Sequence, residues 1–147
     1  MKPLIKLGGA DTNPVFSPDG KFIAFESDGG TIKWAGLRYV YIVPSSGGEP
    51  KRLAATPDEN CRIIAWSKDG KEIYVSETYR TSARVYAVPV DGRKPRALTP
   101  ADGNYTGVSF SLDGTAMAFV YQNSETPPDV KRLTGYSPFL SFSSLTT

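Results

Sequence analysis

A short motif that recurs three times constrains the fold of this chain more than any other feature of its sequence. Each copy consists of an aromatic residue, Ser, any residue, Asp and Gly, and an apolar run begins shortly after the glycine. The aspartates are Asp19, Asp69 and Asp113, so the motif recurs about every 44 to 50 residues. A repeat of this length that contains several short strands is typical of β-propellers and other stacked arrays.

The segments around the motifs predict an all-β fold. Each unit contains apolar runs separated by turns rich in Gly, Asp and Pro, and no segment shows a sustained period of 3.6 residues. Residues 22–25, 39–43 and 117–121 are apolar without alternation. An antiparallel strand with one solvated face alternates apolar and polar residues, so both faces of these sheets are expected to be covered. Four-stranded sheets stacked face to face as propeller blades satisfy this condition.

We therefore expect a partial β-propeller of about three four-stranded antiparallel blades, at residues 10–55, 56–100 and 101–134. The last blade is expected to be shortened, because only Asp129 and Val130 remain of a third strand before residues 131–134, which resemble a fourth strand. Residues 4–7 resemble the ends of the later units, so residues 1–9 are predicted to be the outer strand of a preceding blade. Residues 135–147, rich in Ser and Thr, are predicted to be an irregular tail.

The repeated motif is expected to form a tight turn and not a binding site. Gly takes a positive φ at no steric cost, and an Asp side chain can accept hydrogen bonds from the backbone close by. In each copy the Ser is expected to pair with the Asp two residues further on. This structural assignment covers Ser17, Asp19, Gly20, Ser67, Asp69, Gly70, Ser111, Asp113 and Gly114.

The composition argues against several classes of function. Among the 147 residues are 17 basic and 15 acidic ones, and a net charge of +2 is too weak to indicate nucleic acid or an anionic membrane as a partner. No apolar run is long enough to span a membrane. With one cysteine, Cys61, and no histidine, we expect no metal, and no motif indicates a cofactor. Residues 1–9 lack the apolar core of a signal peptide, which favours a cytoplasmic location; a periplasmic one stays open if the natural start lies upstream.

The residues also argue against catalysis by this chain. A Ser-His-Asp triad needs a histidine, and α/β-hydrolases carry a Gly-x-Ser-x-Gly elbow; the chain has neither. Glu26, Asp28, Glu77 and Glu125 lie near the ends of predicted second strands, where some could converge as a glycosidase-like pair. We predict instead that they are solvated residues of the rim. No catalytic residue is therefore assigned.

Two groups of side chains are candidates for binding. Trp34, Tyr79 and Tyr105 fall in predicted loops, and loops on a rigid scaffold often bind ligands, although local packing is an equal alternative. Basic clusters such as Lys51-Arg52 fall at the predicted fourth strands. They either form a cationic rim for a partner or protect edge strands from aggregation.

A resemblance to a known family rests on three runs of the first unit. Residues 16–25 read Phe-Ser-Pro-Asp-Gly-Lys-Phe-Ile-Ala-Phe, residues 40–44 read Val-Tyr-Ile-Val-Pro, and residues 47–53 read Gly-Gly-Glu-Pro-Lys-Arg-Leu. This pattern resembles the TolB-type β-propeller repeat, and the resemblance extends over residues 4–134. Residues 118–130, Ala-Phe-Val-Tyr-Gln-Asn-Ser-Glu-Thr-Pro-Pro-Asp-Val, resemble the last propeller blade of prolyl oligopeptidase-family serine peptidases of the acylaminoacyl-peptidase-like branch.

The resemblance implies a function for the chain. In that family the propeller filters access to the active site, while a separate α/β-hydrolase domain carries the chemistry. The chain would then be a non-catalytic propeller fragment that serves substrate gating and domain packing, with the peptide substrate or the hydrolase domain as partner. Two alternatives stay open, a TolB-like protein-interaction module and a truncated product without a function of its own. Because an open arc of three blades leaves two apolar faces uncovered, we also expect a homodimer that completes a ring.

Overall fold

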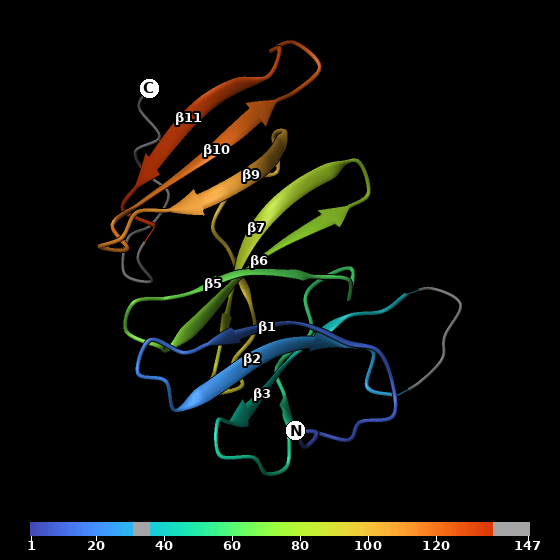
Figure 1. The fold of residues 1–147 in the computed structure, drawn as a ribbon. Coiled ribbons are helices and arrows are strands. Elements are labelled where there is room, and N and C mark those ends of the chain that lie inside the picture. The colour runs from blue at the N-terminus through green and yellow to red at the C-terminus, as the bar shows by residue number, and fades with distance from the viewer. Residues whose placement is uncertain (31–35, 137–147) are drawn as a thin grey trace.

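The structure, a computed structural model, describes residues 1–30 and 36–136, and every regular element within these ranges is a β-strand. The strands form three antiparallel sheets that lie one after another along the chain (Figure 1). The predicted all-β, partial-propeller fold is confirmed. The strands are β1 (Asp11–Phe16), β2 (Phe22–Ser27), β3 (Tyr39–Pro44), β4 (Lys51–Arg52), β5 (Arg62–Trp66), β6 (Glu72–Tyr79), β7 (Ser82–Pro89), β8 (Arg96–Ala97), β9 (Asn104–Phe110), β10 (Ala116–Gln122) and β11 (Asp129–Thr134).

Each sheet follows chain order, so every connection within a blade joins neighbouring strands. The first sheet is β1-β2-β3-β4, the second is β5-β6-β7-β8, and the third contains β9, β10 and β11. The register is continuous from Phe22↔Pro44 to Ser27↔Tyr39 between β2 and β3. The first strand of each sheet pairs less regularly, with a bulge such as the one between Thr12 and Val15. The bulges bend the first strands and increase their local twist.

The apolar strands β6 and β7 of the middle sheet are buried on both faces. Along β7, Tyr86 and Val88 pack toward the first sheet, whereas Val85 and Ala87 pack toward the third. Successive side chains of a strand point to opposite faces, so a strand between two neighbours needs apolar residues at every position. Two layers of the core therefore lie between adjacent sheets, and a third cluster covers the outer face of the first sheet.

Residues 1–9 form no strand in the structure, which differs from the outer strand expected for them. Ile5 and Leu7 instead pack against the outer face of the first sheet, beside Phe25, Tyr41 and Val43. The strand expected here would pair with the third strand of a preceding blade, and the described residues contain no such strand. Residues 1–9 thus contribute apolar cover and not backbone pairing.

The third sheet also differs in detail from the expectation for residues 129–134. These residues form one continuous strand, β11, which pairs with β10 from Ala116↔Thr134 to Tyr121↔Asp129. The division into the remnant of a third strand and a fourth strand is therefore wrong. The residues have the composition of a fourth strand, but β10 offers a free edge along its whole length and the longer pairing satisfies more backbone groups. The blade is shortened, as predicted, to three strands in the described part.

Candidate functional site

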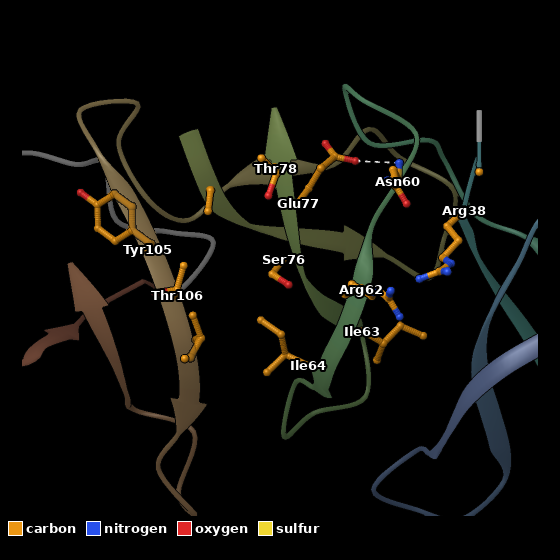
Figure 2. Close-up of a pocket in the computed structure, with 14 residues that line it drawn as sticks. Arg38, Asn60, Arg62, Ile63, Ile64, Ser76, Glu77, Thr78, Tyr105 and Thr106 are labelled. Carbon is orange, nitrogen blue, oxygen red and sulfur yellow. Dashed lines mark hydrogen bonds between the residues drawn. The ribbon is translucent and has the colours of Figure 1, made fainter. Parts of the chain in front are cut away.

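A groove of about 700 Å³ lies between the second and third sheets and is the candidate site (Figure 2). The strands β1, β5 and β9, the first of each sheet, contact one another in sequence, so they form a common inner side of the arc. We call this cavity the inner-strand groove because β5 and β9 supply much of its wall. It is lined by Gly36, Arg38, Asn60, Arg62, Ile63, Ile64, Ser76, Glu77, Thr78, Ala83, Tyr105, Thr106, Gly107 and Val108.

Glu26 lies beside this groove and is completely buried, which overturns the prediction that it is a solvated rim residue. Its Oε1 atom accepts hydrogen bonds at 2.7 Å from both the Ile63 backbone N–H and Asn13 Nδ2. Asn13 Nδ2 also donates to the Ile63 carbonyl oxygen at 3.0 Å. Glu26 and Asn13, both of the first sheet, thus satisfy both backbone groups of one residue of β5. The contact fixes the first two sheets together at the groove.

Glu77, at the outer end of β6, is also buried, so the predicted solvated position is wrong for this residue too. Its carboxylate accepts a short hydrogen bond from Thr56 Oγ1 and further bonds at 3.1 Å from the backbone N–H groups of Asp58 and Asn60. Figure 2 shows the bond from Asn60. Glu77 therefore anchors the connection between β4 and β5 to the second sheet. Glu125 is exposed, as predicted.

Two arginines face Glu26 from different sheets. Arg38 Nη1 lies 3.7 Å from Glu26 Oε2, and Arg62 Nη1 lies 3.8 Å from the same oxygen. These distances allow attraction between the charges but exceed those of hydrogen bonds. Figure 2 shows both guanidinium groups at one end of the groove. The groove region therefore contains two guanidinium groups and two carboxylates. The carboxylate oxygens accept hydrogen bonds from uncharged donors and not from these arginines.

The described residues of the groove show no catalytic arrangement of side chains. The chain contains no histidine, and no three Cys, Asp or Glu side chains gather as metal ligands within residues 1–30 and 36–136. Glu26 and Glu77 are each committed to backbone and side-chain donors, so neither is placed to act as a general acid or base. What the groove presents to a ligand is guanidinium groups, hydroxyl groups and short apolar side chains.

The repeated Asp-Gly motifs lie in tight turns between the first and second strands of each sheet. In the first, Ser17 Oγ donates to Asp19 Oδ1 at 2.6 Å, and the Phe22 backbone N–H donates to Ser17 Oγ at 3.0 Å. Corresponding Ser–Asp bonds of 2.7 and 2.6 Å join Ser67 to Asp69 and Ser111 to Asp113. The glycines of the motif have φ angles of 71°, 71° and 73°, at Gly20, Gly70 and Gly114.

Hydrogen bonding in the turns lowers the pKa of their carboxylates. The Ser111 hydroxyl, followed by the Thr115 backbone N–H and hydroxyl, lowers the pKa of Asp113 to about 2. The Ser17 hydroxyl and the Lys21 backbone N–H lower the pKa of Asp19 from its usual value. Each donor favours the charged form of the carboxylate.

The aromatic residues proposed for binding loops occupy different environments. Trp34 lies outside the described residues. Tyr79 is partly exposed at the end of β6, where it pairs with Ser82 across a tight hairpin, so the predicted loop here is replaced by longer strands. Tyr105 lies buried in β9, and its expected position in a loop is wrong. Its ring packs against the rings of Phe119 and Tyr121 on the neighbouring strand β10. Contact with these aromatic side chains is more favourable for the ring than exposure to water.

The sequence contained one signal for the buried carboxylates. Glu26 follows Phe22, Ile23, Ala24 and Phe25 in an apolar run, and its side chain shares a strand face with Ala24. Ala24 packs in the layer between the first two sheets, so period-two alternation places Glu26 there as well. The donors that satisfy the Glu26 carboxylate come from distant segments, so no local sequence pattern predicts them.

Comparison with known proteins places the chain among propeller domains. No family model matches it. It is 31% identical over 106 residues to dipeptidyl-peptidase 5 of Trichophyton equinum, a match that covers 69% of this chain and 14% of that protein. TolB from Acinetobacter baumannii has a TM-score of 0.63 at 22% identity, over 90% of this chain and 32% of that one. A puromycin-hydrolyzing peptidase of Mycobacterium tuberculosis has a TM-score of 0.65 at 18% identity, over 88% of this chain and 21% of that one.

The fold is that of blades in TolB and in the propeller domains of prolyl oligopeptidase-like peptidases, and the predicted resemblance is confirmed. In sequence the chain resembles dipeptidyl-peptidase 5 and spans about 14% of the length of that relative. No catalytic domain is evident in the described residues. Nor does any helix within these ranges have the length and apolar character needed to cross a membrane.

Proposed function

We propose that this chain forms non-catalytic propeller blades of a serine peptidase of the dipeptidyl-peptidase 5 type. The observation that carries the proposal is the 31% identity to such a peptidase over 106 residues. A histidine-free chain cannot hold a Ser-His-Asp triad, so the catalytic residues would belong to a hydrolase domain elsewhere in the parent protein. The blades would bind that domain and control which peptides reach it.

The inner side of the arc supports a gating role. Blades of a propeller surround a central channel, and β1, β5 and β9 lie next to one another as channel-lining strands would. The Glu26 and Asn13 contacts with Ile63 hold two of these strands at a set separation. A channel of fixed width admits short or extended peptides and excludes folded proteins.

The test begins with the gene. The genomic DNA and transcript on both sides of this coding sequence are to be sequenced, and the whole open frame expressed. We expect the frame to continue into a Gly-x-Ser-x-Gly segment followed by Asp and His, and its product to release dipeptides from peptide p-nitroanilides. A Ser→Ala change in that elbow is the control and should abolish release. A frame without a hydrolase domain, or hydrolysis by the 147-residue chain alone, would contradict the proposal.

A TolB-like interaction module is the second candidate, and the likeness to TolB over 90% of the chain favours it. In that case a protein partner would bind through an exposed part of the blades, and the partly exposed Tyr79 is the side chain to change first. Pull-down with the wild type and with Tyr79→Ala, compared for one identified partner, distinguishes this role from gating.

A further inference from the structure

We propose that Arg38 and Arg62 together form a binding site for a peptide carboxylate at one end of the inner-strand groove. The inference deepens the proposed function and rests on it, because a peptidase propeller meets peptides. The site would lie between the first and second sheets, since Arg38 precedes β3 and Arg62 begins β5. A ligand bound there would contact both sheets at once.

The first argument is an unused donor. Arg38 Nη1 is buried and has no hydrogen-bond acceptor among the described residues. Its nearest carboxylate oxygen, Glu26 Oε2, lies 3.7 Å away, which is too far for a hydrogen bond. A buried charged donor without an acceptor is costly, so an anionic ligand that supplied an acceptor here would gain a favourable hydrogen bond.

Glu26 forms no hydrogen bond with this donor, because its carboxylate is held in place by other donors. Oε1 accepts from Asn13 and from the Ile63 backbone, and Oε2 lies 3.4 Å from Thr12 Oγ1. The carboxylate therefore contributes negative charge to this end of the groove but does not form hydrogen bonds with either guanidinium group. The Arg62 guanidinium is equally uncommitted, at 3.8 Å from Oε2.

The second argument is the placement of the two arginines. The Arg38 backbone is fixed on both sides, since its N–H donates to the Glu59 carbonyl at 2.7 Å and its carbonyl accepts from Cys61 Sγ at 3.5 Å. The Arg62 side chain is 63% exposed and can turn onto a ligand from solvent. Arg38 thus extends from an anchored backbone, and the more exposed Arg62 side chain can move over a ligand once the ligand has entered.

The third argument concerns the kind of anion. A guanidinium group presents two parallel N–H donors that match the two oxygens of a carboxylate. Glu26 offsets one of the two positive charges of Arg38 and Arg62, so one net positive charge remains and a singly charged anion fits better than a doubly charged phosphate. Beyond the arginines the wall offers the hydroxyls of Ser76, Thr78 and Thr106 beside apolar Ile64 and Val108, a surface suited to a short peptide.

The first experiment observes the arginines directly. The full chain, labelled with ¹⁵N-arginine, is titrated with N-acetyl-trialanine, whose C-terminal carboxylate is free, and with the same peptide as its C-terminal amide. The side-chain signals of Arg38 and Arg62, assigned with Lys variants, should shift with the carboxylate peptide and not with the amide. A third peptide, a C-terminal amide with one internal Asp, then shows whether the site binds an acidic side chain as well as a C-terminal carboxylate. No shift with either carboxylate, or equal shifts with the amide, would overturn the proposal.

The second experiment measures affinity in variants. Because each hydrogen bond to a charged group contributes about 1.5 to 3 kcal/mol, Arg62→Gln should weaken binding of the carboxylate peptide by about tenfold or more. Arg93→Gln is the matched control, because the Arg93 side chain is 79% exposed and pairs with Asp91 at 2.7 Å. Arg38→Gln is informative only if circular dichroism shows that the variant keeps its native structure. If it does not, the comparison of Arg62→Gln with Arg93→Gln provides the test. Equal affinity of Arg62→Gln and Arg93→Gln would contradict the proposal.

These outcomes are separable from the test of the proposed function. A parent gene without a hydrolase domain would overturn the peptidase role and leave carboxylate binding to stand on the titration. If the signals of Arg38 and Arg62 do not shift in the titration, the proposed carboxylate site is wrong, and the peptidase role is then tested by the gene sequence alone.

Discussion

Glu26 of β2 and Ile63 of β5 belong to different sheets, and the carboxylate of the first accepts the backbone N–H of the second at 2.7 Å. A backbone N–H at the edge of a sheet usually bonds to a neighbouring strand, and here a side-chain carboxylate takes the place of that strand. The contact links the packing of the arc to the groove, because Ile63 and Arg62 are adjacent in β5 and both line it.

Removal of the Glu26 carboxylate should destabilise the fold strongly. Glu26→Ala leaves the Ile63 N–H without its acceptor, removes one of the two acceptors of the Asn13 amide and leaves two arginines without a counter-charge. We expect the free energy of unfolding to fall by about 3 kcal/mol, as for other buried charged partners. Urea unfolding monitored by tryptophan fluorescence measures this. Glu125→Ala, at an exposed site, is the control and should change stability by less than about 0.5 kcal/mol. Equal effects of the two changes would show that the contact is energetically neutral.

Tyr136 should contribute mainly through packing. Its ring packs edge-on against Tyr74 and Phe110, with centroid distances of 5.8 and 5.7 Å, and its hydroxyl donates to the Gly114 carbonyl at 2.6 Å. Tyr136→Phe removes one hydrogen bond and should cost about 1 kcal/mol. Tyr136→Ala also empties the space between the second and third sheets and should cost about 3 to 5 kcal/mol. If the two variants unfold at the same urea concentration, the ring does not hold the sheets together.

The low pKa of Asp113 should depend on Ser111. The folded pKa of about 2 lies below the usual 3.8, so the charged turn stabilises the folded state above the unfolded pKa, and this contribution is lost as the pH falls toward 2. Ser111→Ala should raise the pKa toward 3.8, whereas Ser111→Thr, which keeps the hydroxyl, should leave it low. Titration of the carboxyl carbon by ¹³C NMR gives the midpoint directly. An unchanged midpoint in Ser111→Ala would assign the low pKa to Thr115 instead.

The outer face of the third sheet should make the isolated chain self-associate. Val130 of β11 is 75% exposed and pairs with Val120 of β10, and β11 has no strand on its other side in the described part of the chain. An open sheet edge can pair with the same edge of a second copy, and exposed apolar surface such as that of Val130 favours the contact. Light scattering should give a mass twice the 15.9 kDa of one chain, and Val130→Lys should shift it toward one chain. A wild type that stays monomeric at high concentration would contradict the expected homodimer.

Local features of this protein could be read from its sequence. The Ser-x-Asp-Gly turns close through bonds between residues at most five positions apart, such as Ser17 to Asp19 and Phe22 to Ser17. The apolar runs of β2, β3 and β10 indicated sheets covered on both faces, because side-chain direction alternates along any strand. Turn chemistry and strand periodicity act over a few residues, so the all-β repeat and its three sheets followed from them.

The groove and its charges depended on contacts between distant residues. Glu26 was expected at a solvated rim and is buried because Asn13 and Ile63, the second of them 37 positions away, supply its donors. Residues 129–134 were expected to divide between two strands and form one, because β10 presents a free edge to them. The amino-acid sequence by itself determined the turns, the strands and the absence of a histidine base. Only the tertiary structure decided which carboxylates are buried and which arginines stay open, because burial and hydrogen bonding depend on the packing of neighbouring sheets.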